Sequence, residues 1–569
     1  MDLVEEELRL GTWPRRLLHV PSMTSHVWRE GNTYNGIANP PYNAISYTWG
    51  RWRLERDEDP HVKPIDVKGI DWRLPRIRPH HFAPSQFHRA IEAATYSPFR
   101  FQDVPSEMLA SVDFLWVDVV CIDQRDAEPR FRAEVGRQAG IFDRARHVFI
   151  WLSSTSSGVF ESFIASTAAF GQLHQDPDEP EWEYEGDDYP RKGRPVETIP
   201  TSATVWSLLL RVLDDPWWSS LWTLQEAYMR ADAYLLSNNG DLVTFPRFMK
   251  PYEPWRLSDL LITYDTLRTV CEQATQDSSD PWYTATQDMY KRKGLRALAT
   301  RNPLAIYEAA TNRQTTKEVD RVYGIQQIFN CRVGNTTVEA AERTCTYSLD
   351  DLEEQLGLKL LDCLPVSSQY HVFTQPTTLA SQWRLQRHSI VPVESATYNC
   401  HKDEVSGPNM RERCCFTVSA QRTLELRGLA MPLQALLLAT RRLNCEPNSK
   451  TVLKLYLDAS LSNAAPHFIG ETKCSEIDQL QSSHAPRELN LICLGVAYGF
   501  YSCRIYALLV VAQQLAWKRL GLCYWETFHD RSRPSISKLS EMNAVFMRLV
   551  QCSWQPFCGV YSAELSCIQ

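Results

Sequence analysis

The sequence contains none of the common catalytic signatures. It has no GxxxxGK(S/T) phosphate loop, no GxSxG nucleophile elbow, no HExxH zinc motif and no GxGxxG after a predicted strand. These absences argue against the common P-loop ATPases, α/β-hydrolases, zinc proteases and classical dinucleotide dehydrogenases. They do not exclude an enzyme of another kind.

An excess of basic charge is also missing. The 569 residues include 60 Lys and Arg against 68 Asp and Glu, which gives a net charge of −8. Nucleic acid is therefore not the expected partner, because its recognition normally needs a basic excess or a basic stripe. The one basic cluster is interpreted as a solvated helix face: Lys291, Arg292, Lys293, Arg296 and Arg301.

Long apolar segments are scarce. The first eight residues are acidic and lack the apolar run of a signal peptide. The one long apolar stretch, Leu491–Val511, contains Arg504 and two glycines, so we predict two buried strands there and no membrane span. We therefore expect a soluble, cytoplasmic protein.

The 16 cysteines do not form a recognisable disulfide scaffold. No CxxC pair occurs, and fourteen of the cysteines follow residue 330. Cys400-His401 and Cys414-Cys415 offer four potential zinc ligands, but their spacing matches no common zinc module. Reduced, partly buried thiols are the favoured interpretation, and no metal site is predicted.

The length leaves room for several folding units, since domains average about 150 residues. Residues 1–41 look like an irregular lead-in. We predict an α/β domain over 42–240 with an acidic surface insertion at 174–194, a mainly helical region over 241–414 and a β-rich unit over 415–569.

Two apolar runs predict the α/β domain. Phe114–Ile122 and Val148–Leu152 are nearly continuous in apolar residues, as strands buried on both faces should be, and a helical pattern separates them. This order predicts a parallel sheet with a right-handed crossover. A strand over Tyr42–Gly50 and a helix near Ser85–Thr95 are also expected. Strand-like runs recur near the C-terminus at Thr423–Leu429, Thr451–Leu457, Leu489–Val496, Arg504–Val511 and Leu522–Trp525.

Four short segments occur in a characteristic order. They are Ala44-Ile-Ser-Tyr-Thr-Trp-Gly50, Leu115-Trp-Val-Asp-Val-Val-Cys-Ile-Asp-Gln124, Ile141-Phe-Asp-Arg-Ala-Arg-His-Val-Phe-Ile-Trp-Leu152 and Pro216-Trp-Trp-Ser-Ser-Leu-Trp-Thr-Leu-Gln-Glu226. Together they closely resemble the heterokaryon incompatibility (HET) domain of filamentous fungi, over residues 42–228. The sequence departs from that pattern at Ser220, where the family usually has Arg, and at Ser153, where it usually has Gly. The resemblance implies a role in fungal nonself recognition and programmed cell death.

The HET domain is in turn similar to TIR domains, which have a flavodoxin-like parallel sheet. Many TIR domains cleave NAD at the nicotinamide–ribose bond with one glutamate, which closes a Ser-x-Trp-Cys-x-x-Glu segment. Ser220-Leu-Trp-Thr-Leu-Gln-Glu226 has the same spacing, so the resemblance points to Glu226 as the catalytic residue. A carboxylate there could stabilise an oxocarbenium-like state. NAD would be the substrate, and no cofactor is expected.

Four further residues are candidates for binding NAD. Tyr47 and Trp222 could stack on the nicotinamide or adenine ring. Asp123 and Gln124 follow a predicted strand at its carboxyl end, where open α/β sheets place their ligands.

Each candidate also has a structural interpretation. Thr223-Leu-Gln-Glu226 reads as a capping box, in which Glu226 would bond a backbone amide at a helix start. Asp118 could bond a neighbouring loop, and Asp123 could form a turn. Four tryptophans and one cysteine of these segments are interpreted as core residues: Trp49, Trp116, Trp151, Trp222 and Cys121.

Three functions stay open. The domain could be an NAD-consuming enzyme switched on by self-association, a non-catalytic adaptor, or a divergent, inactive copy. Recognition of a still unidentified protein partner would fall to the rest of the chain.

Overall fold

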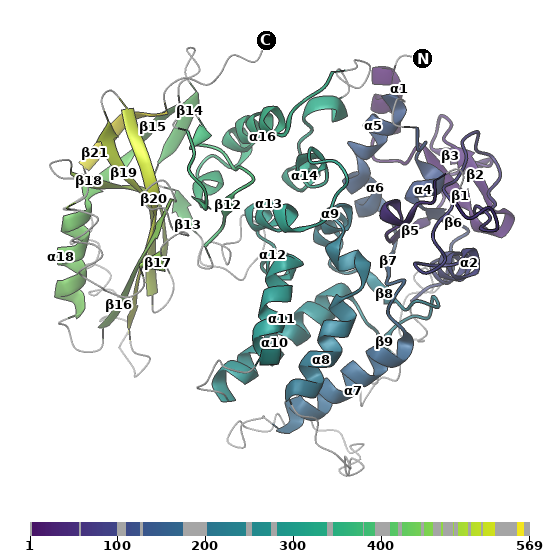
Figure 1. Ribbon diagram of the computed structural model, residues 1–569. Helices are drawn as coiled ribbons and strands as arrows, with labels where there is room; N and C mark the ends of the chain where they lie inside the picture. Colours follow the sequence, from purple (N-terminus) through teal and green to yellow (C-terminus); the bar gives the residue numbers. More distant parts are fainter. Residues whose placement is uncertain are drawn as a thin grey trace. The chain divides into compact units, whose positions relative to one another are not determined.

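The chain folds into two compact units, seen here in a computed structural model (Figure 1). The first unit comprises residues 1–299 and 312–346, and the second comprises residues 300–311 and 347–569. The structure describes residues 3–55, 58–98, 110–125, 129–173, 202–245, 253–274, 281–337, 345–378, 381–392, 410–412, 414–418, 424–444, 449–458, 468–469, 482, 488–498, 502–513, 516–529 and 555–562. The acidic insertion predicted at 174–194 and the Cys400-His401 pair lie outside these residues.

The first unit is built on a six-stranded sheet of order β2-β1-β6-β5-β7-β8. The four strands from β6 to β8 run parallel, whereas β1 and β2 are antiparallel additions. The expected parallel sheet is confirmed, with β5 lying between β6 and β7. The strands are β1 (Arg16–His19), β2 (Thr24–Val27), β5 (Tyr42–Ser46), β6 (Phe114–Trp116), β7 (Val148–Trp151) and β8 (Tyr234–Leu236).

Two predictions in this unit need correction. The lead-in predicted to be irregular supplies β1 and β2, and Leu18 of β1 pairs with Leu115 of β6. The apolar run 114–122 is a strand only to Trp116, and it continues as the short helix α4 (Asp118–Cys121). Its apolar character does not separate the two states, because a buried strand and a buried helical turn are equally apolar.

Helices and short strands complete the first unit, and α7, α8 and α10 lie beside one another (Figure 1). The predicted helix near 85–95 is present as α2. The helices are α1 (Leu3–Leu10), α2 (Pro84–Ala93), α5 (Pro129–Val135), α6 (Gln138–Arg144), α7 (Ser157–Leu173), α8 (Ser202–Leu213), α9 (Trp222–Met229), α10 (Leu257–Ala274), α11 (Pro281–Arg292), α12 (Leu295–Thr300) and α14 (Asp320–Tyr323). The 3-10 turns are η1 (Val20–Ser22), η2 (Gly50–Trp52), η3 (Pro216–Ser219), η4 (Gln326–Phe329) and η5 (Gly334–Thr336), and the short strands are β3 (Thr33–Tyr34), β4 (Ile37–Ala38), β9 (Thr244–Phe245) and β10 (Glu253–Pro254).

A buried network of charges fixes the link between α5 and α6. Glu134 accepts a hydrogen bond from Arg137 Nε at 2.8 Å and from the backbone N of Arg15 at 2.9 Å. Arg15 Nη2 also pairs with Glu7 at 2.6 Å. Because both carboxylates have cationic partners, their charges are compensated away from water. The network fixes Arg137 immediately before the first residue of α6.

A glutamine from η4 braces the same link. Gln327 Oε1 accepts the backbone N of Ala139 at 2.7 Å, and its Nε2 donates to Val135 O at 2.5 Å. A side chain on Gly136 would place its Cβ 2.8 Å from the backbone oxygen of Thr336, so the contact with η5 is close. The start of α6 is therefore held from two sides.

The second unit carries a nine-stranded antiparallel sheet and the helix α18 (Leu433–Asn444). The predicted C-terminal strands all overlap strands of this sheet. Leu491–Val511 forms two paired strands, β18 and β19, as expected. The strands are β13 (Met410–Glu412), β14 (Cys415–Val418), β15 (Leu424–Pro432), β16 (Ser449–Leu457), β17 (Phe468–Ile469), β18 (Leu489–Tyr498), β19 (Ser502–Gln513), β20 (Ala516–His529) and β21 (Gln555–Ser562).

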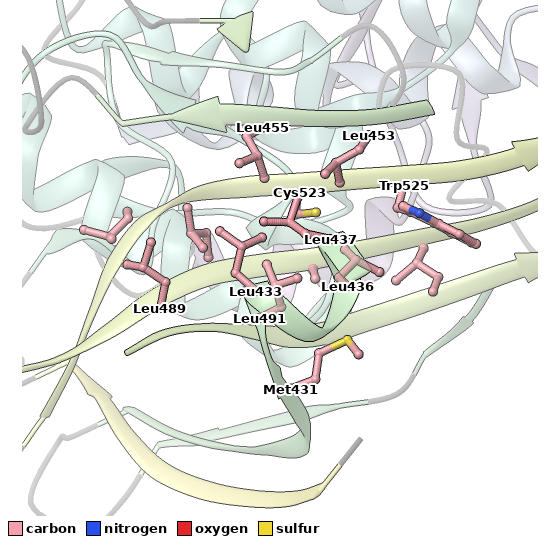
Figure 2. Packing of buried hydrophobic residues seen from close by; sticks show 14 of the residues in the cluster. Met431, Leu433, Leu436, Leu437, Leu453, Leu455, Leu489, Leu491, Cys523 and Trp525 are labelled. Atoms are coloured by element: carbon pink, nitrogen blue, oxygen red, sulfur yellow. The ribbon is translucent and has the colours of Figure 1, made fainter. Parts of the chain in front are cut away.

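Figure 2 shows how α18 covers one face of this sheet. Leu433 and Leu436 of the helix belong to one buried cluster with Leu491, Cys523 and the fully buried Trp525. Alternation along the strands places these side chains on a common face. The remaining elements of the second unit are α13 (Pro303–Asn312), α16 (Leu349–Cys363), η6 (Ser367–Gln369), β11 (Val372–Phe373) and β12 (Ser389–Ile390).

No helix within the described ranges combines the length and apolar character needed to cross a membrane.

Candidate functional site

Polar side chains collect at one edge of the parallel sheet. Ser46 is the last residue of β5, and Asp118 comes two residues after the end of β6. β5 and β6 run parallel, so their carboxyl ends meet at the same edge. Open α/β sheets place ligands at this edge, where the strand connections diverge.

Glu226 is buried in the middle of α9, with 9 % of its surface exposed. Its Oε1 accepts a hydrogen bond from Gln138 Nε2 at 2.9 Å. Its Oε2 is buried and has no hydrogen bond of normal geometry. The pKa of Glu226 is raised to about 8, because burial and the negative charge of Asp118 raise it by more than the hydrogen bonds of the Ser46 hydroxyl and the Gln138 amide lower it. Near neutral pH this carboxyl therefore holds a proton.

The capping-box interpretation of Glu226 is wrong. α9 starts at Trp222, one residue before the threonine of that motif, and its N-cap residue Leu221 makes no side-chain cap. Thr223 Oγ1 donates instead to the carbonyl oxygens of Trp217 and Ser220, at 2.7 and 3.0 Å. Glu226 lies one turn inside the helix and is bonded by a side-chain amide, so its position is not explained by helix capping.

Two residues that the sequence did not single out complete the surroundings of Glu226. Gln138 is the first residue of α6 and is buried, although the sequence showed it only as part of a helical repeat. Ser46 is a polar residue in a fully buried strand, and its hydroxyl accepts a hydrogen bond from Trp217 Nε1 at 2.7 Å. A polar residue inside an apolar segment was the available signal in both cases.

Asp118 bonds a neighbouring loop, which was the favoured expectation. Its Oδ2 accepts Trp49 Nε1 at 2.7 Å, and its Oδ1 accepts the backbone N of Val119 at 2.6 Å. Burial raises the pKa of Asp118, and these hydrogen bonds partly offset the rise. Asp118 and Glu226 are thus two buried carboxyl groups that interact electrostatically.

Tyr47 is a core residue that borders this pair of carboxyls. Its ring packs among Phe82, Phe87 and Trp151, at centroid distances of 5.6–6.3 Å. Burial and the nearby Asp118 raise the pKa of its hydroxyl, and Glu226 adds to the effect. Tyr47 is therefore close to the carboxyls, but its ring faces are shared with other aromatic side chains.

Asp123 and Gln124 have local partners. Asp123 Oδ1 accepts Arg125 Nε at 2.8 Å and the backbone N of Arg125 at 3.1 Å, and this pairing lowers the pKa of Asp123. Gln124 donates to the carbonyl oxygens of Asp118 and Ile122, at 3.1 and 2.9 Å. Gln124 thus shapes the loop that carries Asp118, and Asp123 makes the turn that was its structural alternative.

The predicted aromatic residues divide into buried and half-exposed groups. Trp116 and Trp151 are fully buried, as expected for core residues. Trp222 is half-exposed and lies one helical turn before Glu226, so the two residues share a face of α9. Cys121 is buried, and burial raises the pKa of its thiol to about 12, as expected for an unreactive filler.

The segment that departs from the family pattern at Ser220 is contacted by a distant arginine. Arg313 Nη1 donates to Ser220 O at 2.9 Å and to Thr223 Oγ1 at 3.1 Å. Although Ser220 stands where the family usually has Arg, a guanidinium reaches the backbone of this segment from 93 residues away and makes a charge-assisted bond there.

Among the described residues, no group of three or more His, Cys, Asp or Glu side chains is placed to hold a metal ion.

Replacing Gln138 by Leu should raise the pKa of Glu226 above its value of about 8. The change removes the one hydrogen bond to Oε1, which favours the ionised carboxylate, and leaves a buried acceptor unpaired. We also expect a loss of about 1–2 kcal/mol in unfolding free energy. The carbon-13 shift of the Glu226 carboxyl, followed against pH, measures the first effect. An unchanged titration in a folded variant would contradict the geometry described above.

Comparison with known proteins identifies one similarity. Residues 42–226 match the family model described as Heterokaryon incompatibility protein (HET). The match begins with β5 and ends at Glu226, so the predicted HET resemblance is confirmed over this segment. Searches of curated proteins and of solved structures returned no match to the chain.

Proposed function

We propose that the HET segment, residues 42–226, is an NAD-cleaving module of a fungal protein for nonself recognition and programmed cell death, with Glu226 as its catalytic residue. The observation that carries the proposal is the buried carboxyl of Glu226, held by Gln138 and raised in pKa to about 8. A strongly perturbed carboxyl beside a second carboxyl is typical of a reaction centre.

The proposed reaction breaks the bond between C1′ of the nicotinamide ribose and the pyridinium nitrogen. The bonding electron pair leaves with nicotinamide and neutralises its positive charge, while an oxocarbenium-like charge develops on the ribose. The ionised carboxylate of Glu226 stabilises that charge. Water then attacks C1′ and loses a proton, which gives ADP-ribose. Since the ionised form does this work, the rate should rise with pH through about 8.

The arrangement of the strands supports the same proposal. Numbered along the chain from β5, the four parallel strands have the order 2-1-3-4, as in flavodoxin-like sheets. Ligands of such folds bind where the connections leave the first strand in opposite directions. Ser46 ends this first strand, and its hydroxyl acts on the Glu226 carboxyl.

Self-association fits the burial of Glu226. With 9 % of its surface exposed, this residue reaches a substrate only after neighbouring groups move. We propose that assembly of the HET segment in the cytoplasm supplies this change, in response to a protein partner that the rest of the chain recognises. Trp222 would then stack on a ring of NAD, and Tyr47, Asp123 and Gln124 would support the site from the core and the adjacent loop.

NAD consumption by the full chain at high protein concentration tests the proposal. Wild type should convert NAD to nicotinamide and ADP-ribose, and Glu226→Gln should lose at least a hundredfold in rate while remaining folded. Glu161→Gln, on the exposed face of α7, is the matched control and should keep the wild-type rate. A folded, self-associated wild type without turnover would reject the enzyme and favour the adaptor.

A further inference from the structure

Two arginines contact the segment that leads into α9, and one of them also bonds the backbone of a lysine. Arg51 of η2 donates from Nη2 to Pro216 O and to Ser219 Oγ, at 3.2 and 3.1 Å. Arg313 bonds the backbone of Ser220 and, through Nε, the carbonyl oxygen of Lys293 at 3.0 Å. Ser219 and Ser220 are therefore contacted by two arginines, one of which also bonds the backbone of Lys293.

Arg313 is a buried cation without a carboxylate partner among the described residues. Arg313 is 2 % exposed, and the hydrogen bonds of its guanidinium go to carbonyl and hydroxyl oxygens, including a second one to Lys293 O at 2.6 Å. Neutral acceptors satisfy its N–H groups but do not cancel its charge. The region around Ser220 therefore has an uncompensated positive charge in a desolvated setting.

Lys293 adds a second cation that lacks a direct partner. It is half-buried, and within the described part of the chain its Nζ makes no hydrogen bond or ion pair. Arg313 bonds the carbonyl oxygen of Lys293, so the two residues are neighbours. Burial lowers the pKa of Lys293, the charge of Asp214 opposes this, and the charges of Arg313 and Arg51 lower the pKa further. The expectation of a solvated basic face therefore holds for the exposed Lys291 but not for Lys293.

The nearest acidic residues do not neutralise this group. Asp215 bonds the backbone N of Trp217 at 3.0 Å, the backbone N of Ser154 at 2.8 Å and Thr155 Oγ1 at 3.2 Å. Asp214 is exposed, and it acts on Lys293 only through its charge. Three cations thus face two acidic residues, and one of these, Asp215, already accepts hydrogen bonds from the start of η3 and from Ser154 and Thr155.

We propose that Arg51, Lys293 and the Ser220 hydroxyl bind the phosphates of a nucleotide, with Arg313 as a positioning residue beneath them. Arg51 has guanidinium N–H groups beyond the Nη2 that it uses, Lys293 offers an ammonium, and the Ser220 hydroxyl is half-exposed and makes no hydrogen bond in the described structure. A phosphate supplies the negative charge that this desolvated group lacks and accepts from all three donors.

The ligand class follows from the position of the group. Ser220 precedes Glu226 by six residues, in the segment that opens α9. A dinucleotide that holds its pyrophosphate here would lie along the same segment as the catalytic carboxyl. This assignment to NAD rests on the function proposed above, whereas binding of pyrophosphate itself does not.

Calorimetric titration of the full chain with inorganic pyrophosphate and with ADP-ribose tests the inference. Both should bind wild type, and Lys293→Gln and Arg51→Gln should each weaken binding about tenfold, as expected for the loss of one charge-assisted contact. Lys291→Gln, exposed in the last turn of α11 and two residues before Lys293, is the control and should bind as wild type does. Equal affinity in all four proteins, or no binding to folded wild type, would overturn the inference.

The outcomes separate this inference from the proposed function. Pyrophosphate binding that depends on Lys293, in a protein that cleaves no NAD, would reject the enzyme and retain the phosphate site. NAD cleavage with an unchanged KM in Lys293→Gln would retain the enzyme and reject the phosphate site.

Discussion

Glu226→Gln should stabilise the first unit against unfolding, and the gain should increase with pH. In the folded protein burial raises the pKa of Glu226 to about 8, from an ordinary value of 4.5. Between these values the folded state holds a proton that the unfolded state has released. The wild type therefore loses stability as pH rises through this window, by up to about 1.4 kcal/mol per pH unit. Gln carries no such proton, so it avoids the loss.

The difference in unfolding free energy between the two proteins should be flat below pH 4.5 and above about 8, and it should rise in between by about 5 kcal/mol. Hydrogen exchange of the α9 amides measures it, because these amides report the opening of the first unit separately from the second. Glu161→Gln should show no such trend, since this side chain is exposed. A pH-independent difference would show that Glu226 is ionised in the folded protein.

Gly521→Ala should unfold the second unit or destabilise it by more than about 3 kcal/mol. Gly521 has a φ of +154°, and a Cβ on it would lie 2.0 Å from the carbonyl oxygen of Tyr456 and 2.9 Å from Cα of Leu457. Both atoms belong to the backbone of β16, which pairs with β20 along its length. Neither can move without breaking that pairing, so the strain cannot be relieved by a side-chain rotation.

Exchange of the β19 and β20 amides is the direct measurement, and it should accelerate at least a hundredfold in the variant. Gly158→Ala offers a comparison, because a Cβ there meets open space in helix α7, and its effect should be neutral or slightly stabilising. Wild-type protection of β19 and β20 in Gly521→Ala would mean that the two strands do not pack as described.

The parallel sheet was predictable because its strands are encoded locally. Val148–Leu152 is apolar on both faces, and β7 occupies most of it. β1 was not predictable in the same way, because Arg16–His19 is four residues long and gains its place from pairing with β6. The helical turn begins at Asp118, whose Oδ1 accepts a hydrogen bond from the backbone N of Val119, and an apolar pattern does not reveal this contact.

In the candidate site, too, some residues could be predicted from the local sequence and others could not. A motif pointed to Glu226, and the structure places it in a buried polar environment. Its partner Gln138 lies 88 residues earlier, and Arg313 reaches Thr223 from 90 residues later. Such contacts follow from how helices pack, so the sequence does not indicate which residues Gln138 and Arg313 contact. Asp123 had a local signal, but a local partner, Arg125, satisfies it.

The hydrogen bonds of Gln327 to the link between α5 and α6 have a consequence for synthesis on the ribosome. The HET segment ends at residue 226, yet the first unit also includes residues 312–346, with Gln327 and Arg313 among them. Another 120 residues must therefore be translated before the first unit is complete, which takes about 6–24 s at about 5–20 residues per second. During this interval the start of α6 and the carbonyl of Ser220 lack their final partners. The final surroundings of Gln138 and Ser220 are therefore reached only late in translation.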